Sequence, residues 1–246
     1  MGVISINNTN EATESPQVVV EDELNLNPRD LLRMHDGCPW KWHFIMMAPL
    51  CVYLIVSGMI HGFFGDVPRD LYRELSAYYP TVTHIMRIAS GNAEKSLYAV
   101  YVLIAIRALI FRDKWELRFV IRFIIFAIIF SVIVTHFLKF TTGIPRPHFD
   151  WPPRPLQFAR GYDAFPSGHA IAIITAGLPL ALWFGKKSVT ALIFFIVTTV
   201  CIARIWLGAH HPIDVVGSVP VGAWAARCIF QPHQPPVKSE NNAPPG

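Results

Sequence analysis

Three short segments of the sequence carry side chains that together suit the binding and cleavage of a phosphate ester. They run from Lys139 to Pro147, from Phe165 to His169 and from Arg204 to Asp214. The segments supply fixed cations, histidines, a hydroxyl group, a glycine and a carboxylate. Such a set can hold phosphoryl oxygens, attack phosphorus and protonate the oxygen that leaves.

The first segment places two kinds of cation after an apolar run. Lys139 supplies a point charge, and Arg146 supplies a planar fork that can bind two phosphoryl oxygens at once. Pro145 and Pro147 restrict the backbone on both sides of Arg146. A positively charged helix end followed by a proline turn would explain the same residues without a binding function.

The second segment opens an apolar run, where we expect a helix to begin. A helix N-terminus presents free amides and a positive dipole to an anion. Gly168 permits close backbone approach, the Ser167 hydroxyl can donate to a phosphate oxygen, and His169 would face the same anion. The alternative is a serine N-cap followed by an ordinary interfacial histidine.

The third segment pairs a histidine with a carboxylate four residues later. Pro212 suits the first turn of a helix, and in such a turn Asp214 can reach one ring nitrogen of His210. That contact would fix the tautomer and leave the other nitrogen free to attack. His211 is the competing nucleophile, and a capping role near a helix N-terminus is the alternative for Asp214. Arg204, at the end of the preceding run, adds a third cation.

Long apolar runs must position these segments. Hydrophobic residues make up 52% of the 246 residues and charged residues only 15%, whereas about 25% is usual in soluble domains. Most runs approach the roughly 20 residues that a membrane-spanning helix needs. The sequence therefore predicts an all-α bundle of six transmembrane helices, with spans at about 44–64, 97–112, 118–139, 168–185, 188–207 and 212–230.

Two residues within the spans and one connection need an explanation. Arg107 either extends to the membrane interface or faces a partner inside the bundle. His136 is interpreted as a buried core or relay histidine with no direct role. Residues 66–90 are predicted to form one or two amphipathic interfacial helices, interrupted at Pro80. They would serve as a lateral guide for a lipid substrate or as a lid packed on the bundle.

The flanking cations predict how the bundle is oriented. More Lys and Arg residues lie on the side that carries both termini, and the positive-inside rule makes that side cytoplasmic. The ends of the third and fifth spans then meet the beginnings of the fourth and sixth on the opposite face, where the three segments lie. Residues 1–40 and 231–246 are predicted to be disordered tails, and residues 41–230 form one membrane domain.

Composition also argues against several partners. The net charge is only +4, and much of the positive charge lies in the three segments or beside apolar runs, so nucleic acid is not an expected partner. The four cysteines show no metal-ligand spacing, and the sequence contains no HExxH motif. We therefore expect neither a metal nor another cofactor.

In order, spacing and position at helix ends, the segments resemble the three-part signature of the type 2 phosphatidic acid phosphatase superfamily. The matching patterns are Lys139-x6-Arg146-Pro147, Pro166-Ser167-Gly168-His169 and Arg204-x5-His210-x3-Asp214. The six-helix plan extends the resemblance over most of residues 40–230. The third family pattern usually begins with Ser-Arg, whereas this chain has Ala203-Arg204, which puts one minor phosphate contact in doubt.

The resemblance implies a role for each matching residue. His210 would attack phosphorus and form a phosphohistidine, Asp214 would orient His210, and His169 would protonate the leaving oxygen and later activate water. The phosphoryl oxygens would be held by Lys139, Arg146, Ser167, Gly168 and Arg204.

The resemblance further implies metal-independent hydrolysis of a phosphate or diphosphate monoester on a membrane lipid. Candidate substrates are undecaprenyl diphosphate, phosphatidylglycerol phosphate, phosphatidic acid and the lipid A phosphates. The chain resembles the compact bacterial members of the family, and this resemblance implies a bacterial inner-membrane protein with cytoplasmic termini and a periplasmic active site. A phosphotransferase with the same intermediate is one alternative. A transporter is another, but it would need charges near the bilayer midplane or broken helices in paired halves.

Overall fold

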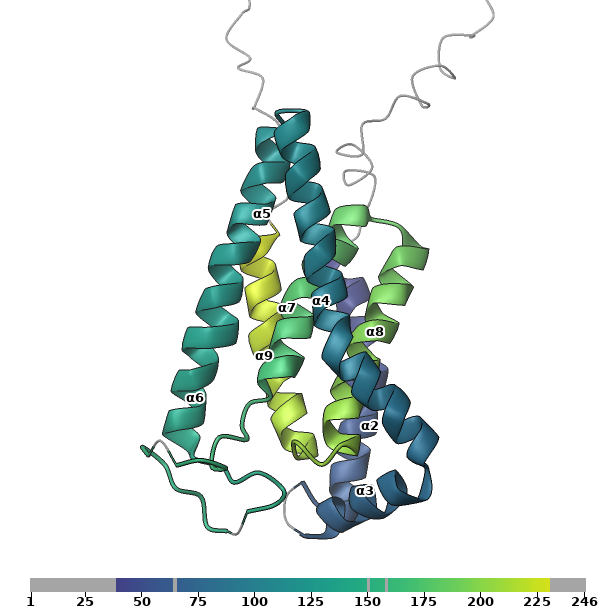
Figure 1. Ribbon diagram of the computed structural model, residues 1–246, viewed down its shortest axis with the longest axis vertical. Coiled ribbons are helices and arrows are strands. Elements are labelled where there is room, and N and C mark those ends of the chain that lie inside the picture. Colours follow the sequence, from purple (N-terminus) through teal and green to yellow (C-terminus); the bar gives the residue numbers. More distant parts are fainter. Residues whose placement is uncertain (1–38, 64–65, 150, 158, 231–246) are drawn as a thin grey trace, which may run out of the picture. The chain divides into compact units, whose positions relative to one another are not determined.

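The computed structural model describes residues 39–63, 66–149, 151–157 and 159–230, and these residues form helices and loops without a strand (Figure 1). The predicted all-α class is confirmed for this part of the chain. The tails predicted at 1–40 and 231–246 lie outside the described residues, apart from the first residues of the helix that begins at Pro39.

Helical segments occupy every predicted span. The bounds of the elements are α2 (Pro39–His61), α3 (Asp66–Tyr78), α4 (Pro80–Ile110), α5 (Lys114–Ala127), the π-helix η2 (Ile128–Val134), α6 (Thr135–Thr142), α7 (Gly168–Phe184), α8 (Lys187–Trp206) and α9 (Pro212–Ile229). The segments α5, η2 and α6 follow one another without interruption, so the third predicted span is one continuous helical run.

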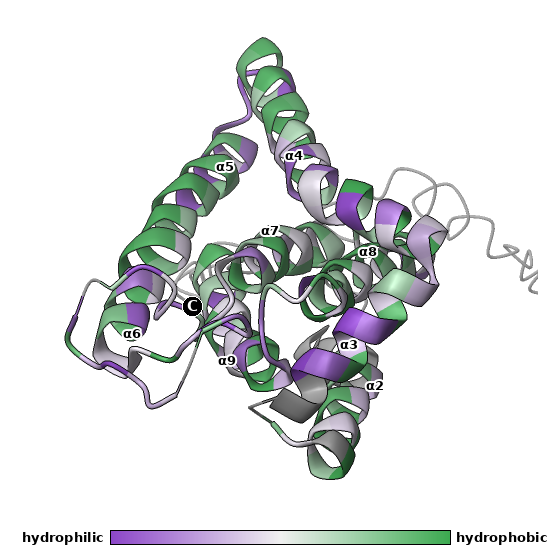
Figure 2. Ribbon diagram, turned by 60° about the horizontal axis from the view of Figure 1, so that its bottom comes forward, coloured by the Kyte–Doolittle hydropathy of each residue, from purple (hydrophilic) through white to green (hydrophobic). Residues whose placement is uncertain are grey.

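Two helical runs among the described residues are long and apolar enough to cross a membrane, namely Lys114–Thr142 and Lys187–Trp206. The helical stretches Met47–Ile60 and Gly168–Phe184 are apolar but shorter. Large apolar side chains of α4 and α5 are exposed, as contact with lipid tails would require. Examples are Val102, Leu103, Leu109, Ile121, Ile124 and Ile125. Figure 2 colours most of α5 and much of α4 as hydrophobic. The crossing of the membrane by all six helices stays a prediction.

The helix α7 forms the core. Every residue from Ala170 to Leu182 is buried, and α7 packs against α8, α9 and α4. A helix that is apolar on all sides is typical of a buried position. Its closest neighbour is α9, where a Cβ atom added to Gly222 would lie 2.7 Å from the side chain of Ile174. Glycine at this position therefore lets the two helices that carry the second and third segments approach each other.

The second predicted span is longer than expected. The predicted break at Pro80 is present, since α3 ends at Tyr78 and α4 begins at Pro80. Proline is compatible with the first turn of a helix, and α4 continues from it to Ile110 without a further break. Only α3 is therefore a separate helix within residues 66–90. Arg107 has a partner in the bundle, since its Nη2 lies 2.6 Å from Oε1 of Glu116 on α5.

The helix α3 packs on the bundle. It contacts α4, α8 and α2, and its Tyr72 is buried with the hydroxyl 3.3 Å from that of Tyr53. This packing favours the lid interpretation of the segment over the lateral guide.

The tight contact at Gly222 yields a stability prediction. Gly222→Ala should destabilise the protein by about 1–3 kcal/mol, because the new methyl group overlaps Ile174 in a packed core. Gly91→Ala on α4 is the matched control, because a Cβ there would meet nothing within 4 Å, and alanine favours the helix by about 0.5–1 kcal/mol. Titration with SDS in a mild detergent measures both free energies of unfolding. Equal stability of the two variants would contradict the packing described for α7 and α9.

Candidate active site

The beginnings of α7 and α9 are joined by hydrogen bonds at one end of the bundle. The backbone N–H of Ser167 donates to the carbonyl oxygen of Asp214 at 3.1 Å. The Ser218 hydroxyl lies 2.7 Å from the same carbonyl oxygen and 3.1 Å from that of Ser167. All three residues are buried. The second and third segments therefore occupy fixed positions relative to each other.

His210 and Asp214 form the centre of the site. Nδ1 of His210 lies 3.4 Å from Oδ2 of Asp214, and the two side chains are 3% and 0% exposed. The same Oδ2 accepts a hydrogen bond from the backbone N–H of His211 at 2.8 Å. Asp214 thus caps α9 and faces His210 at the same time. Its role as the residue that orients a nucleophile stays a prediction. The 3.4 Å separation exceeds an optimal hydrogen bond.

The surroundings of His210 favour a neutral ring. Burial lowers the pKa of His210 below its ordinary value; the Asp214 carboxylate opposes this shift, while the charges of Arg204 and Lys139 add to it. A neutral imidazole with Nδ1 towards a carboxylate leaves Nε2 available as a nucleophile.

His211 sits in a different environment. Burial lowers the pKa of His211 as well, and the Asp214 carboxylate and the Pro145 carbonyl oppose that shift. It is the backbone of His211 that donates to Asp214, whereas the ring of His210 faces the carboxylate. The geometry therefore favours His210 over its neighbour as the nucleophile.

A glycine turn places the first segment. The helix α6 ends at Gly143, which adopts a left-handed conformation with φ of 55° and donates its N–H to the Lys139 carbonyl at 3.0 Å. A Cβ atom at Gly143 would collide with the Arg154 carbonyl. The chain then returns so that the Arg146 N–H donates to Gly161 at 2.8 Å. Only glycine permits both the conformation and the close approach.

Arg146 and Lys139 share an anionic partner that the sequence did not reveal. Asp163 accepts from Nε of Arg146 at 2.8 Å and from Nη2 at 3.0 Å, and its Oδ2 lies 3.9 Å from Nζ of Lys139. Burial disfavours the charged carboxylate, but the hydrogen bonds and charge of Arg146 and the charge of Lys139 outweigh this and lower the pKa of Asp163. Asp163 occupies one edge of the guanidinium and leaves Nη1 on the other.

Arg204 is held from α4. Its Nη1 donates to the Ser90 hydroxyl at 3.1 Å, and Ser90 is only 3% exposed. Glu94, one turn further along α4, lies within electrostatic range of Arg204. The sequence analysis missed Ser90, Glu94 and Ser218. An acidic residue three positions before an apolar run was the available signal for Glu94.

The second segment contributes an exposed histidine and a buried hydroxyl. His169 is exposed and lies within electrostatic range of Arg204 and His210. Ser167 is the residue before α7, but its hydroxyl makes no capping hydrogen bond. A simple N-cap would make that bond. Gly168 is the first residue of α7, and a Cβ there would meet only a Thr135 methyl group at 3.7 Å, so packing alone does not require glycine.

Several buried polar atoms at this end lack a hydrogen-bond partner in the protein. They include the Ser167 hydroxyl, Nε of Arg204, Nδ1 of His210 and Oδ1 of Asp214. An unsatisfied buried group costs about 1–3 kcal/mol, so such a cluster in one place is typical of a site prepared for a ligand. A phosphoryl group offers acceptor oxygens to the hydroxyl and to the guanidinium.

The expectation that His136 is buried is wrong. Its side chain is exposed, and Nδ1–H donates to the Val132 carbonyl at 2.8 Å. The π-helix η2 precedes this residue, and its wider turns rotate the following side chains away from the positions that a regular α-helix predicts. His136 was expected inside because it lies within an apolar run, and a position within such a run does not define which face of the helix a side chain occupies.

The cations, histidines and hydroxyl group described above are the chain's own means of binding an anion at this site. Among the described residues, no group of three or more His, Cys, Asp or Glu side chains is placed to hold a metal ion.

Comparisons with known proteins bear on the family of this part of the chain. Residues 120–236 match the PAP2 superfamily. That range contains the cations, both candidate catalytic histidines and Asp214. This part of the chain is therefore a PAP2 superfamily domain. The helices α2, α3 and α4 precede the PAP2 match, so Ser90 and Glu94 reach the site from outside it.

The chain is also 29% identical over 109 residues to an Escherichia coli (strain K12) protein named "Putative undecaprenyl-diphosphatase YbjG". The alignment covers 40% of this chain and 52% of that protein, so the chain spans about half the length of the curated relative that it matches. No solved structure matches this chain.

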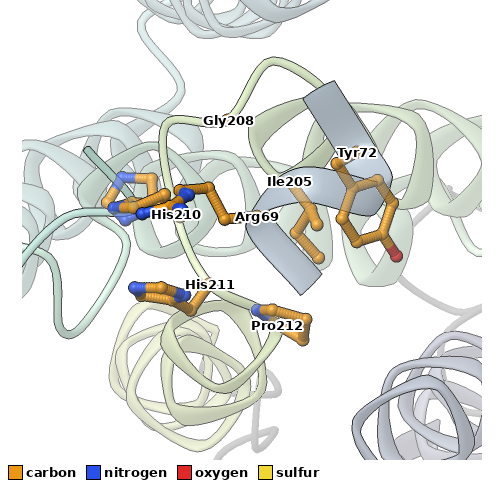
Figure 3. Close-up of a pocket in the computed structure, with 8 residues that line it drawn as sticks. Arg69, Tyr72, Ile205, Gly208, His210, His211 and Pro212 are labelled. Carbon is orange, nitrogen blue, oxygen red and sulfur yellow. The ribbon is translucent and has the colours of Figure 1, made fainter. Parts of the chain in front are cut away.

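The helix α3 lies beside the loop that carries His210 and His211 (Figure 3). Arg69 and Tyr72 of α3 line a small cavity of about 10 Å³ together with Ile205, His210 and His211. Arg69 lies within electrostatic range of His211. A helix outside the PAP2 match thus covers the loop that carries the candidate nucleophile.

The low pKa of His210 yields a prediction about pH. His210 must be neutral to attack, and a pKa below the ordinary value of about 6.5 keeps it neutral at neutral pH. Asp214→Asn removes the carboxylate that raises this pKa, so the acidic limb of kcat/KM should move to lower pH. The rate should also fall by about 10²- to 10⁴-fold. Profiles of both enzymes on one substrate measure the shift, since ionisation of the substrate is the same for both. An acidic limb that moves to higher pH would contradict this account of His210.

Proposed function

We propose that this protein hydrolyses a phosphate or diphosphate monoester on a membrane lipid through a phosphohistidine at His210. The observation that carries the proposal is the buried His210–Asp214 pair, 3.4 Å apart, within electrostatic range of Lys139 and Arg204. The PAP2 match over residues 120–236 supports phosphatase chemistry.

The reaction proceeds in two displacements. The lone pair on Nε2 of His210 forms a bond to phosphorus, and the bond from phosphorus to the ester or bridging oxygen breaks with its electron pair on that oxygen. His169 donates a proton to the leaving oxygen. A water molecule then attacks the phosphohistidine, gives a proton to His169 and releases inorganic phosphate together with the neutral His210 ring.

Fixed cations stabilise the charge of the transferring group. Phosphoryl transfer depends mostly on positioning and on electrostatic stabilisation of the equatorial oxygens. Lys139, the remaining edge of Arg146 and Nε of Arg204 supply cationic donors, and the Ser167 hydroxyl and the first amides of α7 supply neutral ones. These groups perform the role that metal ions have in other phosphoryl-transfer enzymes, so the proposed reaction is independent of metal.

The substrate is a lipid because the site lies at the ends of apolar helices. Lys139 and Arg204 belong to the last turns of the two runs that are long and apolar enough to cross a membrane. The name of the Escherichia coli relative supports undecaprenyl diphosphate among the candidates. We place the site at the periplasmic face of a bacterial inner membrane, with six transmembrane helices and cytoplasmic termini.

The neighbouring histidines provide the test of the mechanism. His210→Ala should reduce phosphate release from lipid phosphates by at least about 10³-fold, because the nucleophile is lost. His211→Ala should retain turnover within about tenfold, because Asp214 takes its hydrogen bond from the backbone of residue 211. Release of inorganic phosphate by purified protein from a panel of lipid monophosphates and diphosphates measures both.

Size-exclusion profiles in detergent serve as the folding control, and the assays are run with and without EDTA. Normal turnover in His210→Ala, or loss in His211→Ala alone, would overturn the assignment of the nucleophile. Loss of wild-type activity on chelation, restored by a divalent cation, would overturn the metal-independent mechanism. Trapped phosphohistidine without phosphate release would identify a phosphotransferase.

A further inference from the structure

A second binding site for phosphate adjoins the proposed one. We infer that an open cavity on the α6 side of Lys139 binds the phosphate that remains on the lipid when a diphosphate is cleaved. This inference rests on the proposed function, and it selects lipid diphosphates over lipid monophosphates as the preferred substrate class.

The cavity lies between α6 and the loop that leads to α7. Its volume is about 250 Å³. A cavity needs only about 10–15 Å³ to hold one water molecule, so this cavity is large enough for a phosphoryl group. Both α6 and that loop contribute polar side chains to its lining. The lining residues are His136, Lys139, Phe140, Gln157, Arg160 and Asp163, with Ala159 and Tyr162.

The position of the cavity suits a leaving group. It shares Lys139 with the proposed phosphoryl site, and its Asp163 accepts hydrogen bonds from Arg146 of that site, so the two sites are contiguous. His210, in contrast, lines the small cavity beneath α3. Figures 1 and 2 show α3 and α6 on opposite sides of α9. An in-line displacement places the attacking and leaving groups on opposite sides of phosphorus, so attack from the α3 side sends the leaving group towards α6.

The charges of the lining suit an anion. Lys139 and Arg160 are cationic. The single lining carboxylate, Asp163, is held by two hydrogen bonds from Arg146, whose charge offsets it. Gln157 adds an amide donor. Nδ1 of His136 is fixed on the Val132 carbonyl, which orients the ring without using Nε2.

The chemistry explains why this cavity discriminates between substrates. When a diphosphate is cleaved, the bridging oxygen keeps the electron pair of the broken bond. That oxygen becomes a terminal oxygen of the lipid monophosphate, on which negative charge increases. Cations at this position stabilise the transition state. A lipid monophosphate loses an alcohol instead, which carries no phosphate for Arg160 to bind.

Arg160→Ala tests the inference with two substrates. We compare kcat/KM for a prenyl diphosphate and for the prenyl monophosphate of the same chain length, measured as release of inorganic phosphate from full-length protein in detergent. The variant should lose about 10- to 100-fold on the diphosphate, the usual effect of removing a charged hydrogen-bond donor, and less than threefold on the monophosphate. Arg160→Lys should recover part of the loss, since it retains the charge.

Arg87→Ala is the matched control. It removes a different exposed cation, which lies on α4 near the same end of the bundle. An equal loss on both substrates in Arg160→Ala, no loss on the diphosphate, or the same loss in Arg87→Ala would overturn the second site. The wild-type protein and His210→Ala report on the proposed function separately. No release from either substrate by the wild type, or full activity in His210→Ala, would overturn the hydrolase itself.

Discussion

The contact between the beginnings of α7 and α9 is the interaction on which the candidate site depends. The backbone of Ser167 donates to the carbonyl of Asp214, and the Ser218 hydroxyl reaches both carbonyls. The amides at the start of α7 therefore face the loop of His210. Glycine at position 222 allows the two helices to approach closely enough for this contact. Without the contact between Ser167 and Asp214, the nucleophile and the amides that would receive the phosphoryl group would not be held at fixed positions relative to each other.

The second constraint is the collection of three cations in one place before any substrate has bound. Like charges in a partly buried site repel one another strongly, because the effective dielectric constant is low. Asp163 hydrogen-bonds to Arg146 and lies near Lys139, and Ser90 and Glu94 accompany Arg204. These partners come from a loop and from α4, so the site is completed by parts of the chain outside its three motifs. The partners orient the cations and leave donors available for the ligand.

The sequence predicted much of this arrangement because motif spacing and apolar runs are local signals. The all-α class, the helical segments at the six runs and the start of α9 at Pro212 follow from hydrophobic length and proline chemistry. The spacing of the motifs also predicted that His210 and Asp214 lie at one end of the bundle together with Arg204. Tertiary partners such as Asp163 and Ser90 could not be predicted, because their contacts join residues that are 17 and 114 positions apart. His136 was misplaced because its position within an apolar run does not define which face of the helix it occupies. The helix α4 was longer than expected because the helix that begins at Pro80 continues into the second span.

The central claim is that His210 carries the phosphoryl group, and direct mapping of the intermediate tests it most closely. Wild-type protein is mixed with a lipid diphosphate labelled on its terminal phosphate, quenched within milliseconds at alkaline pH and digested for mass spectrometry. The account predicts one labelled peptide, with the phosphoryl group on the ring of His210. Label on His211 or on His169, or phosphate release without any labelled histidine under conditions that preserve phosphohistidine, would contradict it.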